Sequence, residues 1–327
     1  MMNNILITGG AGFIGSSLCD KLLDDGYRVI IIDNFNNYYD PKIKVNNINE
    51  VKARMKKNNI DYEKLKLVKG DIRDMDLLDD IAQNDKIDLV IHLAAMAGVR
   101  PSIQNPKLYY DVNIMGTLNI LEMCKKHDIK NVIFASSSSV YGNNKKVPFS
   151  VEDSVDNPIS PYAATKKSGE LLCHTYHHLY NINCICLRFF TVYGPRQRPD
   201  LAIHKFTKLI SKGEEIPFYG DGSTSRDYTY ISDIVDGIEK SINYINNNDN
   251  VYELFNLGGD KTISLSEMVK AIELSLGKKA IINRMPMQAG DVNRTCADIS
   301  KSTVKLGYKP KFSFQEGIDN FVRWFNK

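Results

Sequence analysis

The sequence predicts a doubly wound α/β protein, in which helices cover both faces of a parallel β-sheet. Short β-branched runs alternate with longer helical stretches through the first 190 residues, and a glycine-rich turn directly follows the first run. Parallel strands are buried on both faces and need long crossover connections, which produces this alternation. We expect strands at residues 5–7, 29–32, 65–68, 89–92, 132–135 and 184–190.

The length of 327 residues predicts about two structural units, at roughly 150 residues per domain. After Gly194 the alternation gives way to short strands and turns, with helices expected at about 264–276 and 314–325. The last helix carries apolar residues at spacings of three, four and seven, so it should pack on the body. We expect a Rossmann-type domain over residues 1–190 and a smaller α/β region over 191–327, with some of the chain crossing back.

Charge and cysteine content narrow the class of protein. Lys and Arg number 42 against 39 Asp and Glu, and the two signs are interspersed, so we expect no surface for nucleic acid. The six cysteines fit neither a disulfide framework nor a C-x-x-C zinc pair. No apolar run reaches 18 residues, and the N-terminus lacks the basic region of a signal peptide. These features predict a soluble, cytoplasmic protein with reduced thiols and no membrane partner.

Two further segments suggest no chemistry. Residues 34–59 are rich in Asn and Lys and contain Pro41 as a breaker, so they are interpreted as a polar excursion after the second strand. His174, His177 and His178 cluster on one predicted helix, but no H-E-x-x-H motif accompanies them, and we expect no metal site. The sequence also lacks a G-x-S-x-G elbow, which argues against a hydrolase.

A dinucleotide-binding pattern follows the first strand. Gly9 allows a tight turn, Gly12 lets the backbone approach a pyrophosphate, and Gly15 lets the next helix pack close to the strand. Asp33 ends the second strand, where it can accept hydrogen bonds from both adenosine ribose hydroxyls and repel a 2′-phosphate. The pattern therefore predicts NAD rather than NADP. The alternative is a glycine-rich turn followed by a surface Asp.

Other residues near the strand ends are expected to contact the cofactor, because ligands gather at the carboxyl ends of parallel strands. Tyr162 and Lys166, which also have catalytic roles, belong to this group. The remaining members are Phe13, Ile14, Asn34, Asp71, Ile72, Leu93, Ala94, Ala95, Asn113, Ser136 and Phe189.

A serine, a tyrosine and a lysine form the predicted catalytic group. The fifth strand ends in the serine run 136–139, and further along the chain Tyr162 and Lys166 are four apart, on one face of a helix. A phenol is a poor base at neutral pH, but an adjacent ammonium and a positive nicotinamide lower its pKa. We expect Ser137 to share the proton with Tyr162 at the substrate oxygen, and Lys166 to hold the nicotinamide ribose. The alternative is a chance pairing of an exposed Tyr and Lys.

Together these motifs resemble an extended short-chain dehydrogenase/reductase of the nucleotide-sugar epimerase and dehydratase group, and the resemblance covers nearly the whole chain. It rests on the three glycines, Asp33, Asp71-Ile72, the serine run before Val140-Tyr141-Gly142, Tyr162-x-x-x-Lys166 and residues 187–190 (LRFF). More narrowly, the chain is similar to the UDP-glucuronate 4-epimerases at 35–41 (FNNYYDP), 94–103 (AAMAGVRPSI), 191–200 (TVYGPRQRPD) and 288–292 (QAGDV).

The resemblance implies NAD-dependent epimerisation at C4 of a UDP-sugar, most closely UDP-glucuronate, through a 4-keto intermediate. It places tightly bound NAD in residues 1–190 and the UDP-sugar mainly in 191–327. It also implies uracil stacking by Phe218, diphosphate pairing by Arg226, ribose contacts by Asp291, and contacts with a sugar carboxylate by Ser138, Ser139, Thr191 and Arg198. The structural alternatives are a core Phe, a surface Arg and serines that cap the strand end.

Other reaction classes stay open beside this one. Related dehydratases carry an Asp-Glu pair beside the catalytic Ser or Thr, and related decarboxylases a Glu at the second position, whereas this chain has Ser138 and Ser139. Epimerisation is therefore favoured, with UDP-glucose or UDP-N-acetylglucosamine as alternative substrates. A non-catalytic NAD-binding sensor or scaffold is the alternative from another class, against which the intact Ser137, Tyr162 and Lys166 argue.

The resemblance also implies a homodimer. Relatives pair through the helix that contains the catalytic tyrosine and through the helix at about 106–127. Ile114, Leu118 and Leu121 supply apolar spacing for such a face, although an intramolecular core uses the same pattern.

Overall fold

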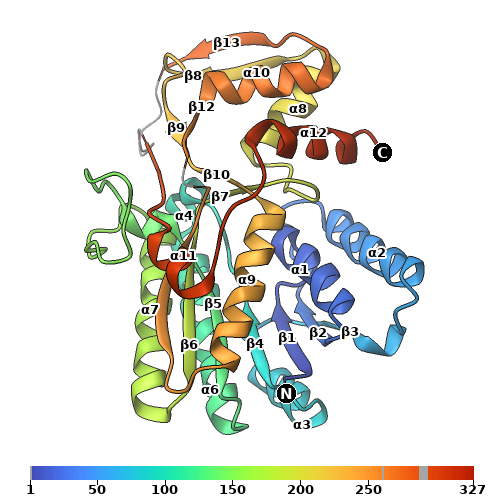
Figure 1. Ribbon diagram of the computed structural model, residues 1–327, viewed down its shortest axis with the longest axis vertical. Helices are drawn as coiled ribbons and strands as arrows, with labels where there is room; N and C mark the ends of the chain where they lie inside the picture. Colours follow the sequence, from blue (N-terminus) through green and yellow to red (C-terminus); the bar gives the residue numbers. More distant parts are fainter. Residues whose placement is uncertain (1, 260, 287–293) are drawn as a thin grey trace.

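The structure is a computed structural model that describes residues 2–259, 261–286 and 294–327. Its centre is a seven-stranded sheet of parallel neighbours in the order β11-β6-β5-β4-β1-β2-β3 (Figure 1). This order confirms the predicted doubly wound fold. The strands are β1 (Asn4–Thr8), β2 (Arg28–Asp33), β3 (Leu65–Lys69), β4 (Leu89–His92), β5 (Asn131–Ser137), β6 (Asn183–Phe189) and β11 (Tyr252–Leu257).

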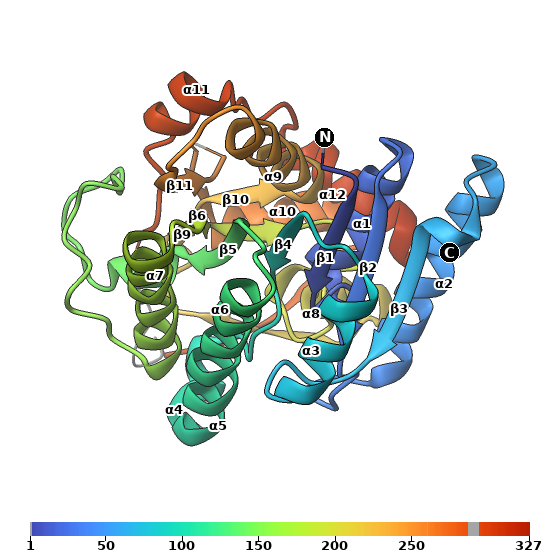
Figure 2. The same ribbon diagram turned by 90° about the horizontal axis from the view of Figure 1, so that it is seen from below.

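Helical layers cover both faces of the sheet (Figure 2). Ile5 and Ile7 of β1 belong to the apolar core on one face, and Leu6 between them belongs to the core on the other. Successive side chains of a strand point to opposite faces, so one buried strand supplies both cores. The helices are α1 (Phe13–Asp24), α2 (Pro41–Lys57) and α9 (Ile231–Asn246) on the first face, and α3 (Met75–Asn84), α4 (Val99–Gln104), α5 (Pro106–Tyr110), α6 (Gly116–Lys126) and α7 (Pro161–Tyr180) on the second.

A second region, at the top of Figure 1, lies beyond the carboxyl ends of the strands. It contains α8 (Ala202–Lys212), β8 (Glu215–Tyr219), α10 (Leu265–Leu276), β13 (Ile281–Met285) and α12 (Phe314–Phe325), so both predicted C-terminal helices are confirmed. The α12 residues Ile318, Phe321 and Val322 are buried. Shorter elements are β7 (Thr191–Tyr193), β9 (Ser225–Arg226), β10 (Tyr228–Tyr230), β12 (Ile263–Ser264), α11 (Ser300–Leu306), and single turns at Tyr62–Lys64, Asp111–Met115 and Ser138–Tyr141.

The interpretation of residues 34–59 as a polar excursion is wrong for most of that segment. Pro41 is the first residue of α2 rather than a breaker, and the Asp40 side chain accepts a hydrogen bond from the Lys42 amide. Proline is favoured at this position because its missing N–H has no helical partner there in any case. The helix buries Ile48, Val51 and Met55 against the core, so three apolar residues among many polar ones suffice to fix it.

The described part of the chain contains no helix long and apolar enough to cross a membrane. Each of the six cysteines is a buried free thiol.

An ion pair inside the protein joins α7 to the sheet. Glu170 Oε1 accepts from Arg188 Nε at 2.8 Å and Oε2 accepts from Arg188 Nη2 at 2.9 Å, and both side chains are almost fully buried. Ser136 Oγ donates to Glu170 at 2.6 Å, and Arg188 Nη1 donates to the Tyr141 hydroxyl at 3.0 Å. That hydroxyl donates to Asn256 Oδ1 at 2.7 Å, so the network reaches β11.

Replacing Glu170 by Gln leaves the Arg188 guanidinium buried without a counter-charge. We expect the free energy of unfolding to fall by about 3–5 kcal/mol, the range for a broken buried pair. Urea unfolding followed by circular dichroism measures this change. Lys107→Ala removes an exposed pair with Asp111 and is the control, expected to cost less than about 1 kcal/mol. A similarly small effect of both substitutions contradicts the anchoring role of Glu170.

Candidate active site

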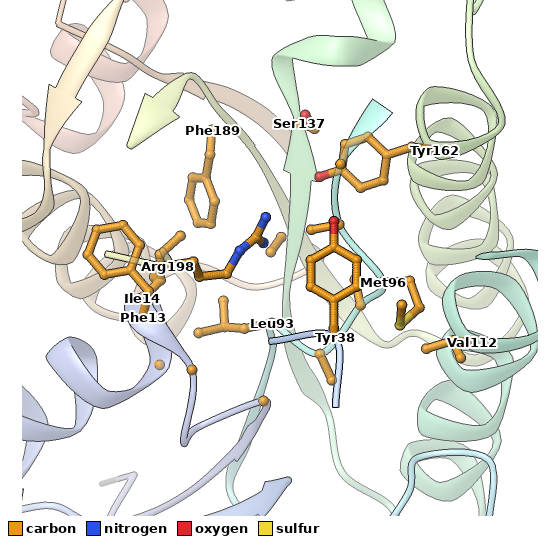
Figure 3. A pocket seen from close by; sticks show the side chains of 18 of the residues that line it. Phe13, Ile14, Tyr38, Leu93, Met96, Val112, Ser137, Tyr162, Phe189 and Arg198 are labelled. Carbon is orange, nitrogen blue, oxygen red and sulfur yellow. The ribbon is translucent and has the colours of Figure 1, made fainter. Parts of the chain in front are cut away.

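A cavity of about 380 Å³ lies at the carboxyl ends of β1, β2, β4, β5 and β6 (Figure 3). Small-molecule sites in doubly wound proteins form at this edge of the sheet. The predicted cofactor and catalytic residues line the cavity, with the exception of Asn113. Ser138, Ser139, Thr191 and Arg198 line it as well. The structure therefore brings together residues that the chain separates by almost 200 positions.

The glycine turn is shaped for a phosphate group. Gly9 has φ +71°, and a Cβ there would lie 2.9 Å from the Ala94 backbone. A Cβ on Gly15 would lie 2.4 Å from the Gly9 carbonyl oxygen, so a side chain would push α1 away from the turn. No side chain caps α1 at Gly12, which leaves the first amides of the helix for a ligand. Helix N-termini of this kind bind pyrophosphate.

The adenosine end of the cavity contains a buried ion pair that the sequence did not suggest. Lys44 Nζ of α2 lies 3.0 Å from Asp33 Oδ1, and both side chains are at most 8% exposed. Asp33 also accepts hydrogen bonds from the Ala11 and Phe35 amides. The carboxylate is thereby fixed at the end of β2, as ribose recognition requires. However, its charge is compensated, so repulsion of a 2′-phosphate is weaker than the sequence predicted.

The next strand end supplies a second carboxylate at the adenosine side. Arg73 Nε and Nη2 donate to the two oxygens of Asp71 at 2.9 and 2.8 Å, and Asn34 Nδ2 donates to Oδ2 at 2.9 Å. The Arg73 hydrogen bonds hold the pKa of Asp71 well below its usual range. Asp71 therefore stays ionised and holds Asn34 against the cavity.

The predicted catalytic residues meet at the end of β5. Tyr162 lies in the first turn of α7, and its phenol is hydrogen-bonded to the Ser137 hydroxyl. Figure 3 shows both oxygens on the same side of the cavity. Lys166, one turn further along, donates to the Ala135 carbonyl oxygen at 2.7 Å. Ser160 caps α7 by accepting from the Ala163 amide, which fixes the turn that carries the phenol.

The protein groups that act on the pKa of Tyr162 differ from the ammonium expected from the sequence, and the effect of the nicotinamide stays a prediction. Burial raises the pKa of Tyr162, and the groups that oppose this rise are the Ser137 hydroxyl and the Arg198 guanidinium rather than Lys166. Burial also lowers the pKa of Lys166 to about 8, because the enclosed ammonium loses its contact with water. Lys166 lines the cavity, and the Arg198 guanidinium is a cation that lowers the pKa of the phenol.

Arg198 is itself tied to a neighbouring carboxylate. Its Nε and Nη2 donate to the two oxygens of Asp200 at 3.0 and 2.8 Å. Its guanidinium carbon also lies 5.3 Å from the centre of the Tyr38 ring. Among the residues that the structure describes, neither contact uses Nη1, which is therefore a donor that can meet a ligand in the cavity.

Three predicted contact residues do not line the cavity that the described part of the chain forms. Phe218 is 3% exposed, and the Arg284 guanidinium lies 5.3 Å from its ring, so a uracil cannot stack there in this structure. Arg226 is absent from the lining, and its Nη1 donates to the Ser225 carbonyl. The Asn113 side-chain amide is hydrogen-bonded to the Met96 backbone and to Thr165, so it positions the segment after β4, and its contact with the cofactor stays a prediction. Asp291 lies outside the described residues.

Other lining residues escaped the sequence prediction. Among them are Asn36, Tyr38, Tyr39, Lys44 and Met96. All but Lys44 lie in the segments FNNYYDP and AAMAGVRPSI, which the sequence analysis singled out without giving these four residues a role. No spacing rule in the sequence predicts that the Lys44 side chain of α2 forms an ion pair with Asp33 at the end of β2.

The glycine turn, the acidic strand end and the Ser–Tyr–Lys group together define an extended short-chain dehydrogenase/reductase. Comparison with known proteins narrows this class, since the model of the GDP-mannose 4,6 dehydratase family matches residues 6–321 and the chain belongs to that family. It is 42% identical to the UDP-glucuronate 4-epimerase of Thermodesulfobacterium geofontis, over 99% of this chain and 96% of the relative.

The chain is also similar in structure to nucleotide-sugar 4-epimerases. The Bacillus cereus UDP-glucuronic acid 4-epimerase, in complex with UDP-glucuronic acid and NAD, aligns with a TM-score of 0.89 and 37% identity over 99% of both chains. The Thermotoga maritima UDP-glucose 4-epimerase with UDP-glucose aligns with a TM-score of 0.87 and 33% identity, over 99% of this chain and 98% of that one.

Replacing Asp33 by Ser removes the ribose-binding carboxylate and leaves Lys44 free to meet a 2′-phosphate. We expect affinity for NADPH to rise relative to NADH by about tenfold or more, the worth of one charge-assisted hydrogen bond. Fluorescence titration of dinucleotide-free protein measures both affinities. The double variant Asp33→Ser with Lys44→Met is the control and should lose the gain for NADPH. Unchanged selectivity in the single variant contradicts the role of Asp33.

Proposed function

We propose that the protein catalyses NAD-dependent epimerisation at C4 of UDP-glucuronate, which gives UDP-galacturonate through a 4-keto intermediate. The observation that carries this proposal is the end of β5, where Ser137 meets Tyr162 and the next two positions are the neutral Ser138 and Ser139. Support comes from the relatives named as UDP-glucuronate 4-epimerases and from the neighbour crystallised with UDP-glucuronic acid and NAD.

In the proposed reaction, different residues act on the proton, the cofactor and the sugar. NAD, when bound, accepts a hydride from C4 of the sugar and returns it to the opposite face. Tyr162 accepts the proton of the C4 hydroxyl, with Ser137 sharing the hydrogen bond, and gives it back when the alcohol re-forms. Lys166 binds the nicotinamide ribose, and the glycine turn with α1 binds the pyrophosphate. Residues 1–190 serve the cofactor, and 191–327 mainly serve the UDP-sugar.

Neutral side chains beside Ser137 favour epimerisation over elimination of water. Elimination needs an acid and a base at two further sugar carbons, and serine hydroxyls titrate far from neutral pH. A carboxylate on the sugar can instead accept hydrogen bonds from Ser138, Ser139 and Thr191, and from Nη1 of Arg198. These residues line the same cavity.

Incubation with UDP-glucuronate, UDP-glucose and UDP-N-acetylglucosamine separately, with products identified by NMR, tests the proposal. We expect UDP-galacturonate from the first, and turnover of a different sugar alone would reassign the substrate. Tyr162→Phe should lower kcat by about 100-fold or more, because the proton acceptor is lost, with substrate affinity within about threefold. Tyr62→Phe changes an exposed ring and should match the unmodified enzyme. Undiminished turnover in Tyr162→Phe contradicts the mechanism.

We also propose a homodimer and a cytoplasmic location. Exposed apolar side chains lie on the neighbouring helices α4 to α7 and the turn before α6, namely Ile103, Tyr110, Met115 and Leu171. A second copy of the chain covers such a surface. Of the residues named from the sequence for this face, Leu121 is wrong, because it is only 1% exposed and belongs to the core. Six free buried thiols support a reducing compartment.

Light scattering at micromolar concentration should give a dimer for the unmodified protein. Met115→Asp combined with Leu171→Asp places charges in the proposed apolar interface, so we expect a monomer. Leu274→Asp changes another exposed leucine, on α10, and should stay dimeric. A monomeric unmodified protein contradicts the proposed assembly.

A further inference from the structure

The polar segment after β2 is held by a series of side-chain hydrogen bonds to its own backbone. Asp33 Oδ1 accepts from the Phe35 amide at 2.9 Å, Asn34 Oδ1 from the Asn36 amide at 3.0 Å, and Asn36 Oδ1 from the Tyr38 amide at 3.2 Å. Each bond is a side-chain turn to the residue two positions on, which holds a loop in one shape. The proposed function gives this segment no role beyond Asp33.

Tyr38, near the end of that segment, lines the part of the cavity that also contains Tyr162 and Arg198 (Figure 3). Its hydroxyl is hydrogen-bonded to Tyr109, whose own hydroxyl donates to the Ala97 carbonyl at 2.7 Å. Gly98 has φ +103°, and a Cβ there would lie 2.9 Å from the Tyr38 hydroxyl oxygen. The segment after β4 thus leaves space for this phenol.

The ring of Tyr38 also contacts Arg198, the guanidinium that lowers the pKa of the Tyr162 phenol. The guanidinium of Arg198 lies over this ring at 5.3 Å, while Asp200 binds the edge of the same group through Nε and Nη2. The Tyr38 ring therefore packs against the flat face of the guanidinium, and the Asp200 carboxylate binds its edge. Figure 3 shows the Arg198 guanidinium and the Tyr38 hydroxyl extending into the cavity on the side of Ser137 and Tyr162.

We propose that Tyr38 is a positioning residue for the sugar, which holds Arg198 so that its free Nη1 meets an anionic group on the hexose. This inference rests on the proposed function, because it takes the sugar to be a uronate. A ring under a guanidinium restricts its tilt without using any of its donors, so Nη1 stays available for a carboxylate. The selectivity for a uronate over a neutral hexose then depends on Tyr38, which lies in the segment after β2.

Affinities measured by calorimetry on the holoenzyme test the proposal, in the Tyr162→Phe background that prevents turnover. The probes are UDP, UDP-glucose and UDP-glucuronate. Tyr38→Leu should weaken binding of UDP-glucuronate about tenfold, within the range for a cation–π contact, and leave UDP and UDP-glucose within about twofold. Tyr38→Phe keeps the ring and should stay within about threefold for all three. Tyr62→Leu, at an exposed ring, is the control for a general effect.

A double-mutant cycle shows whether Tyr38 acts through Arg198. In an Arg198→Ala background, Tyr38→Leu should cause no further loss of UDP-glucuronate affinity. Arg198→Lys keeps the charge but not the planar group, so it should also weaken binding of UDP-glucuronate about tenfold. This second variant tests the proposal even if Tyr38→Leu fails to fold. Equal weakening of UDP and UDP-glucuronate, additive losses in the cycle, or undiminished affinity in Arg198→Lys would overturn the proposal.

The same preparations separate this inference from the proposed function. The product assay on the protein with Tyr162 intact reports epimerisation directly, so its failure removes the proposed reaction. The calorimetric comparison reports sugar recognition alone, so its failure removes the role of Tyr38 while the reaction stands.

Discussion

The arrangement of the site depends on the buried pair between Glu170 and Arg188. Two charges enclosed by apolar residues must stay together, because a separated charge in the interior is strongly destabilising. Tyr162, Lys166 and Glu170 are four residues apart and lie on one face of α7, so the pair fixes the face that meets β5. Each of these three side chains contacts a different residue at the end of β5. The pairs are Tyr162 with Ser137, Lys166 with Ala135, and Glu170 with Ser136. Three turns of α7 are therefore attached to three successive residues of the strand.

A second compensated pair performs the same task at the other end of the cavity. Asp33 and Lys44 connect the end of β2 to α2, and Asp33 also holds the first turn of the segment that leads to Tyr38. Adenosine recognition and the sugar side are therefore joined by a short, hydrogen-bonded stretch of chain. A change at Asp33 alters both the ribose contact and the support for that stretch.

Local patterns in the sequence predicted most of the fold and the centre of the site. The glycine turn, the strand runs and the four-residue spacing of Tyr162 and Lys166 are each set within one element, so periodicity and turn chemistry suffice to find them. The lining residue Lys44 and the contact of Tyr38 with Arg198 join segments that no local rule connects. Phe218 shows the converse: an aromatic residue in a suitable motif was expected to bind a base, but Arg284 on the paired strand β13 covers its ring.

With UDP-glucuronate as the substrate, the distribution of charge decides whether the intermediate survives. A 4-keto uronate is a β-keto acid, and loss of CO₂ moves negative charge from the carboxylate to the oxygen at C4. In the proposed mechanism Tyr162 and Ser137 contact that oxygen, where they can stabilise the charge. A cation at the carboxylate end opposes the transfer, because it stabilises the charge where it starts. In the proposed arrangement Tyr38 and Asp200 hold Arg198 at the carboxylate, so their contacts bear on the product as well as on binding.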